Sequence, residues 1–180
     1  MWHYIIYALL MLYIFYWLIA VIRKRSVGEI YEACGLGLYF TQIFWSQCWL
    51  MLNIQALRVI GFILFVPAAF FVGASFVTLK AKGKPTDSWE STTSFVKNGV
   101  YRVTRHPMFL GTAIWSFALV LVIQSLISTI LASIAIFCLW MASKKEEEFN
   151  LTKFGDEYRG YLTRVPRWNF IKGIKNFKKD

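Results

Sequence analysis

The chain alternates between long apolar runs without charge and shorter segments that hold all of its charged side chains. No Asp, Glu, Lys or Arg occurs in residues 1–22, 33–57, 59–79 or 106–143. A helix needs about 20 apolar residues to cross the ~30 Å hydrocarbon core of a bilayer. The pattern therefore predicts an all-α integral membrane protein whose first three spans are 2–22, 34–52 and 59–79.

The first two runs carry further detail. The run at 1–22 is too long and too aromatic for a cleaved signal peptide, and no basic segment precedes it, so we expect a retained span. The second run is less apolar because it contains Thr41 and Gln42, which predicts that one face packs against protein. Residues 53–58 are expected to form a short turn before the third span.

The last run is too long to be one span. As a single helix, residues 106–143 would extend about 57 Å at 1.5 Å per residue, roughly twice the bilayer core. Its most polar point, Gln124-Ser125, lies near the middle. We therefore predict a hairpin of two short helices, 108–123 and 126–142, which brings the number of transmembrane helices to five.

The distribution of basic residues predicts the orientation. Only 17% of the residues are charged and the net charge is +10. Cytoplasmic loops of membrane proteins are rich in Lys and Arg. With five spans, 19 of the 20 basic residues fall on one side, in segments 23–32, 80–105 and 144–180. The N-terminus is therefore predicted outside and the C-terminus in the cytoplasm, and no nucleic-acid partner is needed to explain the charge.

Common soluble-enzyme motifs are missing from the sequence. The three cysteines, Cys34, Cys48 and Cys138, lie in apolar runs without metal-binding spacing, so we interpret them as small buried hydrophobes. There is also no P-loop, GxSxG elbow or HExxH motif. The sequence therefore disfavours a serine hydrolase or a metal enzyme, and we expect no metal site.

Candidate chemistry begins in the polar segment before the hairpin. Pro107 suits the first turn of a helix, where its missing N–H costs nothing. Arg105 and His106 would then lie at the helix N-terminus, where free N–H groups and the helix dipole favour an anion. The alternative is that Arg102 and Arg105 simply contact lipid phosphates. The residues alone leave both interpretations open.

A second polar segment follows the hairpin. Glu146, Glu147 and Glu148 are adjacent, and carboxylates at the C-terminus of a helix would oppose its dipole. If the helix continues to about Lys153, the three lie mid-helix on different faces, and at least one faces the hairpin. They are either a solvated face paired with neighbouring lysines or carboxylates that bind a ligand amine or ribose hydroxyl.

Together the two segments resemble the membrane family of isoprenylcysteine carboxyl methyltransferases and phospholipid N-methyltransferases. The first matching motif is Gly99-x-Tyr101-Arg102-x-x-Arg105-His106-Pro107-x-Phe109-x-Gly111. The second and third are Glu146-Glu147 and Phe154-Gly155-x-x-Tyr158-x-x-Tyr161. The resemblance covers about residues 98–170 and does not extend to specific positions in the first three spans.

The resemblance implies an S-adenosylmethionine-dependent methyltransferase. Its catalytic region would be 81–180, with hairpin 108–142 and a cytoplasmic C-terminal helical cap over the cofactor site, and 1–80 would add three spans within one structural domain. A lipid or prenylated acceptor would enter from the bilayer. The residues implied to hold the cofactor are Tyr101, Arg105, His106, Pro107, Gly111, Glu146 and Glu147.

Two further roles are hypotheses about the acceptor. Glu146 is the candidate nearest the acceptor, where it would take the proton of an amine. Prenylcysteine enzymes tend to carry an arginine at the position of Ala142, so a prenylcysteine carboxylate would need another partner, and Arg164 is the candidate. Two more departures from the family pattern are Phe109, which lacks a tyrosine hydroxyl, and Asn150, where leucine is common.

Two other functions remain as alternatives. Membrane sterol and steroid reductases share a similar Arg-His-Pro region but use NADPH, although the glutamate pair and the short chain count against them. A non-catalytic membrane protein is the other alternative. The acceptor and the oligomeric state are not predicted by the sequence.

Overall fold

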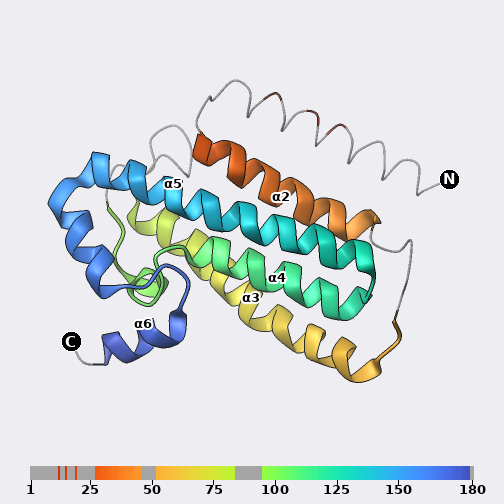
Figure 1. Cartoon of the computed structure of the whole chain (residues 1–180). Helices are drawn as coiled ribbons and strands as arrows, with labels where there is room; N and C mark the ends of the chain where they lie inside the picture. The colour runs from red at the N-terminus through yellow and green to blue at the C-terminus, as the bar shows by residue number, and fades with distance from the viewer. Residues whose placement is uncertain are drawn as a thin grey trace. The chain divides into compact units, whose positions relative to one another are not determined.

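The computed structural model in Figure 1 describes residues 27–45, 52–83 and 95–178, together with Leu12, Phe15 and Ile19. All the regular elements in this part of the chain are helical, which confirms the all-α prediction. The elements are α2 (Val27–Trp45), α3 (Gln55–Lys82), the 3-10 helix η1 (Gly99–Arg102), α4 (Pro107–Ile123), α5 (Leu126–Arg164) and α6 (Phe170–Phe177). Apart from those three positions, the predicted span 2–22 lies outside the described residues.

The helices differ from the predicted spans mainly at their ends. The second helix begins at Val27 rather than at residue 34. Its first turn contains Glu29, whose negative charge interacts favourably with the positive end of the helix dipole. The turn predicted at 53–58 is shorter, because α3 already begins at Gln55. Cys34 is exposed rather than buried, as a small thiol on an outward-facing helix position can be, whereas Cys138 is buried as expected.

The helices have the composition of membrane spans. By length and apolar composition, α3 and α5 are able to cross a bilayer, and α4 is a shorter apolar helix of 17 residues. Large apolar side chains such as Phe62, Val66 and Phe70 are exposed along α3, as expected of a surface that faces lipid. These features indicate a membrane protein, while the number of spans and their orientation stay predictions.

The chain divides into two compact units. Unit 1 comprises Met1–Phe62 and Ser116–Lys145, and unit 2 comprises Ile63–Trp115 and Glu146–Asp180. Helices α3, α4 and α5 each contribute residues to both units. The division predicted at residue 80 stays a prediction.

The hairpin predicted from the polar pair Gln124-Ser125 is present in unit 1. Helix α4 ends at Ile123 and α5 begins at Leu126, and Gln124 has a φ of 56°. The Gln124 side chain accepts a hydrogen bond from Ile54 N at 2.8 Å and donates one to Ile54 O at 2.9 Å. Ser125 Oγ accepts from Ser128 N at 3.1 Å and so caps α5. The polar pair therefore ends one helix and starts the next.

Small residues and neutral polar side chains hold unit 1 together. A Cβ at Gly61 would lie 2.7 Å from Val122 Cγ2 and 2.8 Å from Ala118 O, so only glycine allows this approach of α3 to α4. Gln42 is completely buried, and its Nε2 donates to Ser116 O and Ser128 Oγ, each at 2.9 Å. The prediction that the second span has a face packed against protein is thus confirmed.

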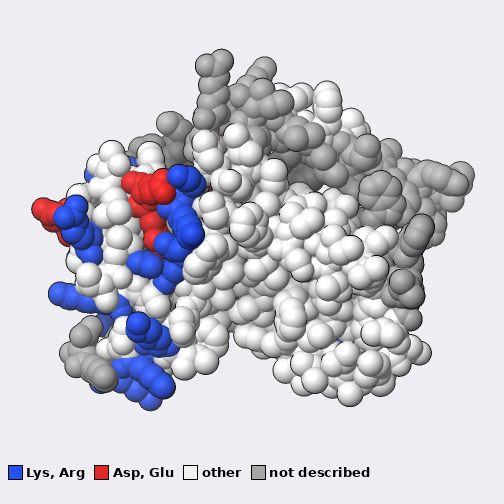
Figure 2. Space-filling view, viewed as in Figure 1, with Lys and Arg blue, Asp and Glu red and all other residues white. Residues whose placement is uncertain are grey.

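Unit 2 contains an aromatic cluster that packs the C-terminal part of α5. Tyr158, Tyr161 and Val165 are buried there, and Phe95 lies edge-on to Tyr161 at a centroid distance of 4.9 Å. Gly155 interrupts the helical dihedrals of α5 with a φ of 57°. Figure 2 shows that Lys, Arg, Asp and Glu side chains gather over the C-terminal part of α5 and over α6. Unit 2 therefore places charge beside a packed aromatic cluster.

Candidate functional site

The site is centred on His106, which stands at the start of α4. Pro107 is the first residue of that helix, as predicted, and the His106 carbonyl accepts a hydrogen bond from Leu110 N at 3.0 Å. The imidazole stacks on Phe109, with ring centroids 5.8 Å apart and planes 8° from parallel. The backbone of His106 therefore caps the helix, while its buried ring packs against Phe109.

Both nitrogens of the His106 ring face carboxylates. Nδ1 lies 3.1 Å from Glu146 Oε2, and Nε2 lies 3.2 Å from Glu147 Oε1. A neutral imidazole has only one N–H, so donation at both nitrogens requires the imidazolium. Burial lowers the pKa of His106, but the charge of Glu146 and the hydrogen bonds to both glutamates outweigh burial and raise it above the ordinary value.

The three adjacent glutamates lie on different faces of α5, which runs to Arg164 and so continues well past residue 142, where the second helix of the hairpin was predicted to end. The side chain of Glu147 is only 8% exposed, whereas that of Glu146 is 49% exposed. Glu148 is exposed. Two residues that the sequence treats alike therefore occupy different environments, one inside a network and the other open to a ligand.

Glu147 is surrounded by cations. Arg167 donates from Nε to Oε1 at 2.8 Å and from Nη2 to Oε2 at 2.5 Å, which forms a bidentate pair. Arg105 Nε lies 3.1 Å from Oε1 without the alignment of a hydrogen bond, so this contact is Coulombic. Burial raises the pKa of Glu147, but the hydrogen bonds from Arg167 and His106 prevail and lower it to about 2.

Backbone contacts join the segment before α4 to the segment after α5. Thr104 Oγ1 donates to Arg167 O at 2.7 Å, and Arg105 N donates to Pro166 O at 3.1 Å. Arg105 Nη1 donates to Leu162 O at 3.2 Å. These contacts bring two segments that are about 60 residues apart in sequence into one site.

Tyr101 supports the site from η1. Its hydroxyl accepts a hydrogen bond from Ser75 Oγ at 3.2 Å, and its carbonyl accepts one from Tyr161 OH at 2.6 Å. Burial raises the pKa of the Tyr101 hydroxyl, which therefore stays protonated. Tyr101 links α3 to the aromatic cluster on α5.

Gly111 and Arg164 lie outside the His106 network. A Cβ at Gly111 would lie 2.8 Å from Val72 Cγ2 and 2.9 Å from Ala68 O, so this glycine serves the packing of α4 on α3. Arg164 is exposed, and its backbone oxygen accepts a hydrogen bond from Asn176 Nδ2. Neither contact reaches the His106 network.

Sequence reasoning missed Arg167, the arginine that pairs with Glu147. The signal was its place directly after Pro166, inside the region 98–170 that the family resemblance covers. Ala142 is only 2% exposed within unit 1, so an arginine there would have to displace its neighbours.

Arg102 stacks its guanidinium 4.1 Å above the Phe177 ring, and Arg105 is held by Glu147. The idea that both arginines only contact lipid phosphates therefore fails for Arg105.

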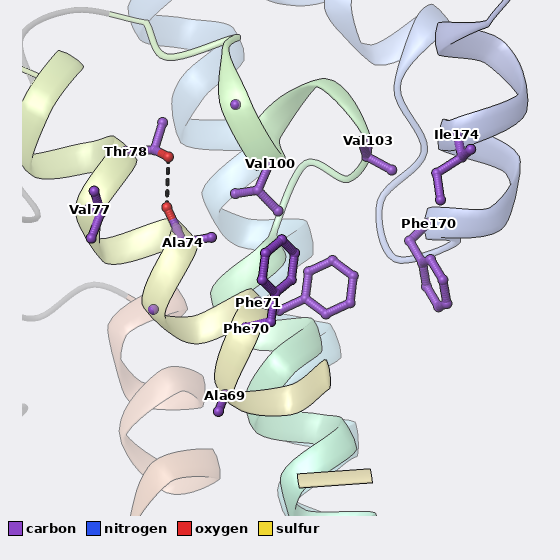
Figure 3. A pocket seen from close by; sticks show the side chains of 12 residues that line it. Ala69, Phe70, Phe71, Ala74, Val77, Thr78, Val100, Val103, Phe170 and Ile174 are labelled. Carbon is purple, nitrogen blue, oxygen red and sulfur yellow. Dashed lines mark hydrogen bonds between the residues drawn. The ribbon is translucent and has the colours of Figure 1, made fainter. Parts of the chain in front are cut away.

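Unit 2 contains an apolar groove of about 690 Å³ (Figure 3). Its walls come from α3, from η1 with Val103, and from α6. Helix α6 is held tightly, because any side chain on Gly173 would collide with the Val103 carbonyl. The lining residues are Ala69, Phe70, Phe71, Gly73, Ala74, Val77, Thr78, Gly99, Val100, Val103, Phe170 and Ile174.

Comparisons with known proteins agree with the motifs. The chain is 30% identical over 160 residues to the protein-S-isoprenylcysteine O-methyltransferase of Homo sapiens, covering 84% of this chain and 55% of the relative. It is 30% identical over 139 residues to that of Mus musculus, covering 74% and 47%. The chain thus spans about half the length of the curated relatives it matches. No solved structure matches it significantly.

A protein-family model provides the assignment. The model described as phospholipid methyltransferase matches residues 56–157, which is more than half of the chain. The matched region includes His106 and both glutamates of the network. The chain therefore belongs to the phospholipid methyltransferase family, which its motifs resemble.

Proposed function

We propose that this protein is a membrane S-adenosylmethionine-dependent methyltransferase that acts on a lipid or lipidated acceptor. The observation that carries the proposal is His106, whose ring nitrogens contact Glu146 and Glu147 and so unite the first two family motifs in one site. Family membership and the methyltransferase names of the relatives support it. They also favour it over an NADPH-dependent reductase or a non-catalytic protein.

The charges of the site fit the amino-acid part of S-adenosylmethionine. Arg105, Arg167 and the His106 imidazolium carry three positive charges against two on the glutamates, so one positive charge remains to attract a carboxylate. The half-exposed Glu146 carboxylate suits an ammonium or a ribose hydroxyl. We assign binding to Glu146, His106 and Arg105, and support of the binding segment to Glu147, Tyr101, Pro107 and Gly111.

The apolar groove is proposed to hold the hydrocarbon chain of the acceptor. Its lining is almost wholly apolar, and it includes outward-facing side chains of α3, such as Phe70 and Val77, that are exposed as lipid-facing residues would be. Its η1 wall ends at Val103, three residues before His106. A chain in this groove would therefore anchor an acceptor close to the charged network.

The protein contributes alignment rather than bond activation. Bound S-adenosylmethionine supplies a methyl group on a sulfonium, whose neutral thioether is a good leaving group. The chain therefore mainly has to orient the acceptor in line with the methyl group and exclude water. A carboxylate or thiolate acceptor needs no base, whereas an amine must lose a proton, and the half-exposed Glu146 carboxylate would take it.

We propose that the protein is integral to the membrane and crosses it several times, with the C-terminal site in the cytoplasm. The support is the distribution of the basic residues, 19 of which fall on one side of the five predicted spans. A cysteine introduced at Leu52 should react with an impermeant reagent from outside. A cysteine at residue Lys97 should react only after the membrane is opened, and the reverse pattern would contradict this orientation.

Calorimetry on the purified protein in detergent tests the function. We expect S-adenosylhomocysteine to bind and NADPH not to bind. Labelled S-adenosylmethionine should then transfer its methyl group to a component of a membrane lipid extract or to a farnesylcysteine analogue. Binding of NADPH alone would favour the reductase, and absence of binding of both compounds would contradict an enzyme of either class.

A further inference from the structure

We propose that Arg167 is a positioning residue of this site: its guanidinium fixes the Glu147 carboxylate, which fixes His106, which in turn orients Glu146. The inference rests on the proposed function, because it assumes that Glu146 meets the ligand. Arg167 itself acts through the other residues.

The geometry of Glu147 is the first argument. The two hydrogen bonds from Arg167 reach both carboxylate oxygens, so they define the plane of the carboxylate as well as its position. His106 Nε2 meets the same Oε1 atom at 3.2 Å. If the carboxylate rotated, the histidine ring would lose this contact.

The order of burial along the chain of contacts is the second argument. The side chains of Arg167, Glu147 and His106 are 20%, 8% and 3% exposed, whereas that of Glu146 is 49% exposed. The open end of the network is therefore Glu146. The buried members hold its orientation through His106 Nδ1, which lies 3.1 Å from its carboxylate.

The backbone of Arg167 is itself held by the binding segment. Thr104 donates to the Arg167 carbonyl at 2.7 Å, and Arg105 N donates to the preceding carbonyl of Pro166. Arg167 is thus fixed at both its backbone and its guanidinium. Lysine would keep the charge but would lose the fork that reaches both oxygens.

A dependence on pH follows from the charges around Glu147. The groups that face it are Arg105, His106 and Arg167, and Tyr158 lies near enough to interact with it. The hydrogen bond from Arg167 is the largest influence that lowers the pKa of Glu147. Without it the carboxylate should take up a proton at a higher pH, and His106 would then lose one of its two charged partners.

The experiment compares Arg167→Ala and Arg167→Lys with the unmodified protein in detergent. Affinity for S-adenosylhomocysteine is measured by calorimetry from pH 5 to pH 9. We expect Arg167→Ala to bind about tenfold more weakly and to lose affinity at a higher pH on the acid side. Compared with Arg167→Ala, Arg167→Lys should restore the pH dependence on the acid side more fully than the affinity. Lysine restores the positive charge but not the two parallel hydrogen bonds of the guanidinium.

Arg159→Ala is the matched control, since this arginine is exposed on α5, the helix that carries Glu147, and lies 3.9 Å from Asp156. It should bind like the unmodified protein. If Arg167→Ala fails to fold, the lysine variant decides, because full affinity at every pH would overturn the inference. Unchanged affinity and pH profile in Arg167→Ala would overturn it too. Failure of the unmodified protein to bind would instead contradict the proposed function.

Discussion

The two units use polar side chains for different purposes. In unit 1, neutral amides such as Gln42 and Gln124 bond to backbone groups and to Ser128, and they hold apolar helices together. In unit 2, Glu147 and His106 are buried with their charges, and the network ends at a half-exposed carboxylate. A buried charge is costly unless it is paired, so it is weak support for stability and a stronger sign of function.

The sharpest test of this contrast is removal of Glu147. Glu147→Ala leaves Arg105, Arg167 and His106 without their shared carboxylate. We expect a loss of about 3–5 kcal/mol in the free energy of unfolding, because buried cations remain uncompensated. Thermal unfolding in detergent measures it. An equally large loss in Glu148→Ala, at the exposed neighbour, would show that the burial of Glu147 is not the cause.

In unit 1 the corresponding test is the hairpin turn. Gln124→Ala removes the two hydrogen bonds to Ile54 and should cost about 2 kcal/mol of stability, at roughly 1 kcal/mol for each bond. Gln124→Gly should cost less, because glycine adopts the φ of 56° at this position without strain. Equal losses in both variants, measured by thermal unfolding, would show that the backbone conformation contributes nothing.

Small-residue packing in unit 1 gives a smaller effect. Gly61→Ala should cost about 1–2 kcal/mol, because the new Cβ would meet Ala118 O and Val122. Gly37→Ala in α2 is the control, since a Cβ there meets nothing within 4 Å and alanine favours a helix. We expect the control to be neutral or stabilising. Similar losses in both variants would contradict a role for the close approach.

A substitution that fills the groove in unit 2 should change the KM for the acceptor without changing cofactor affinity at the His106 network. Ala74→Trp fills the groove, so it should raise the KM for a lipid acceptor about tenfold and leave S-adenosylhomocysteine affinity unchanged. Val66→Trp is the control, because Val66 is 72% exposed on α3 and lies outside the lining. The same rise in KM in both variants would place the acceptor chain elsewhere.

The sequence by itself determined the all-helical class, the turn of the hairpin and the family motifs. Charge-free runs predict apolar helices because burying an unpaired charge in lipid is expensive. The polar pair Gln124-Ser125 marked the end of α4 and the start of α5 to the residue. Pro107 marked the first turn of α4, where its missing N–H costs no hydrogen bond. Such signals are local, so a single sequence contains them.

The tertiary structure decided which residues of the motifs meet. Glu146 and Glu147 are equivalent in sequence, and only the packing around α5 buries one and opens the other. Arg167 pairs with Glu147 because the turn at Pro166, whose carbonyl accepts a hydrogen bond from Arg105 N, holds it beside the segment before α4. Gly111 proved to pack against α3. These contacts join residues 20 to 60 positions apart, and their partners are set by how the helices pack, which no local pattern of residues encodes.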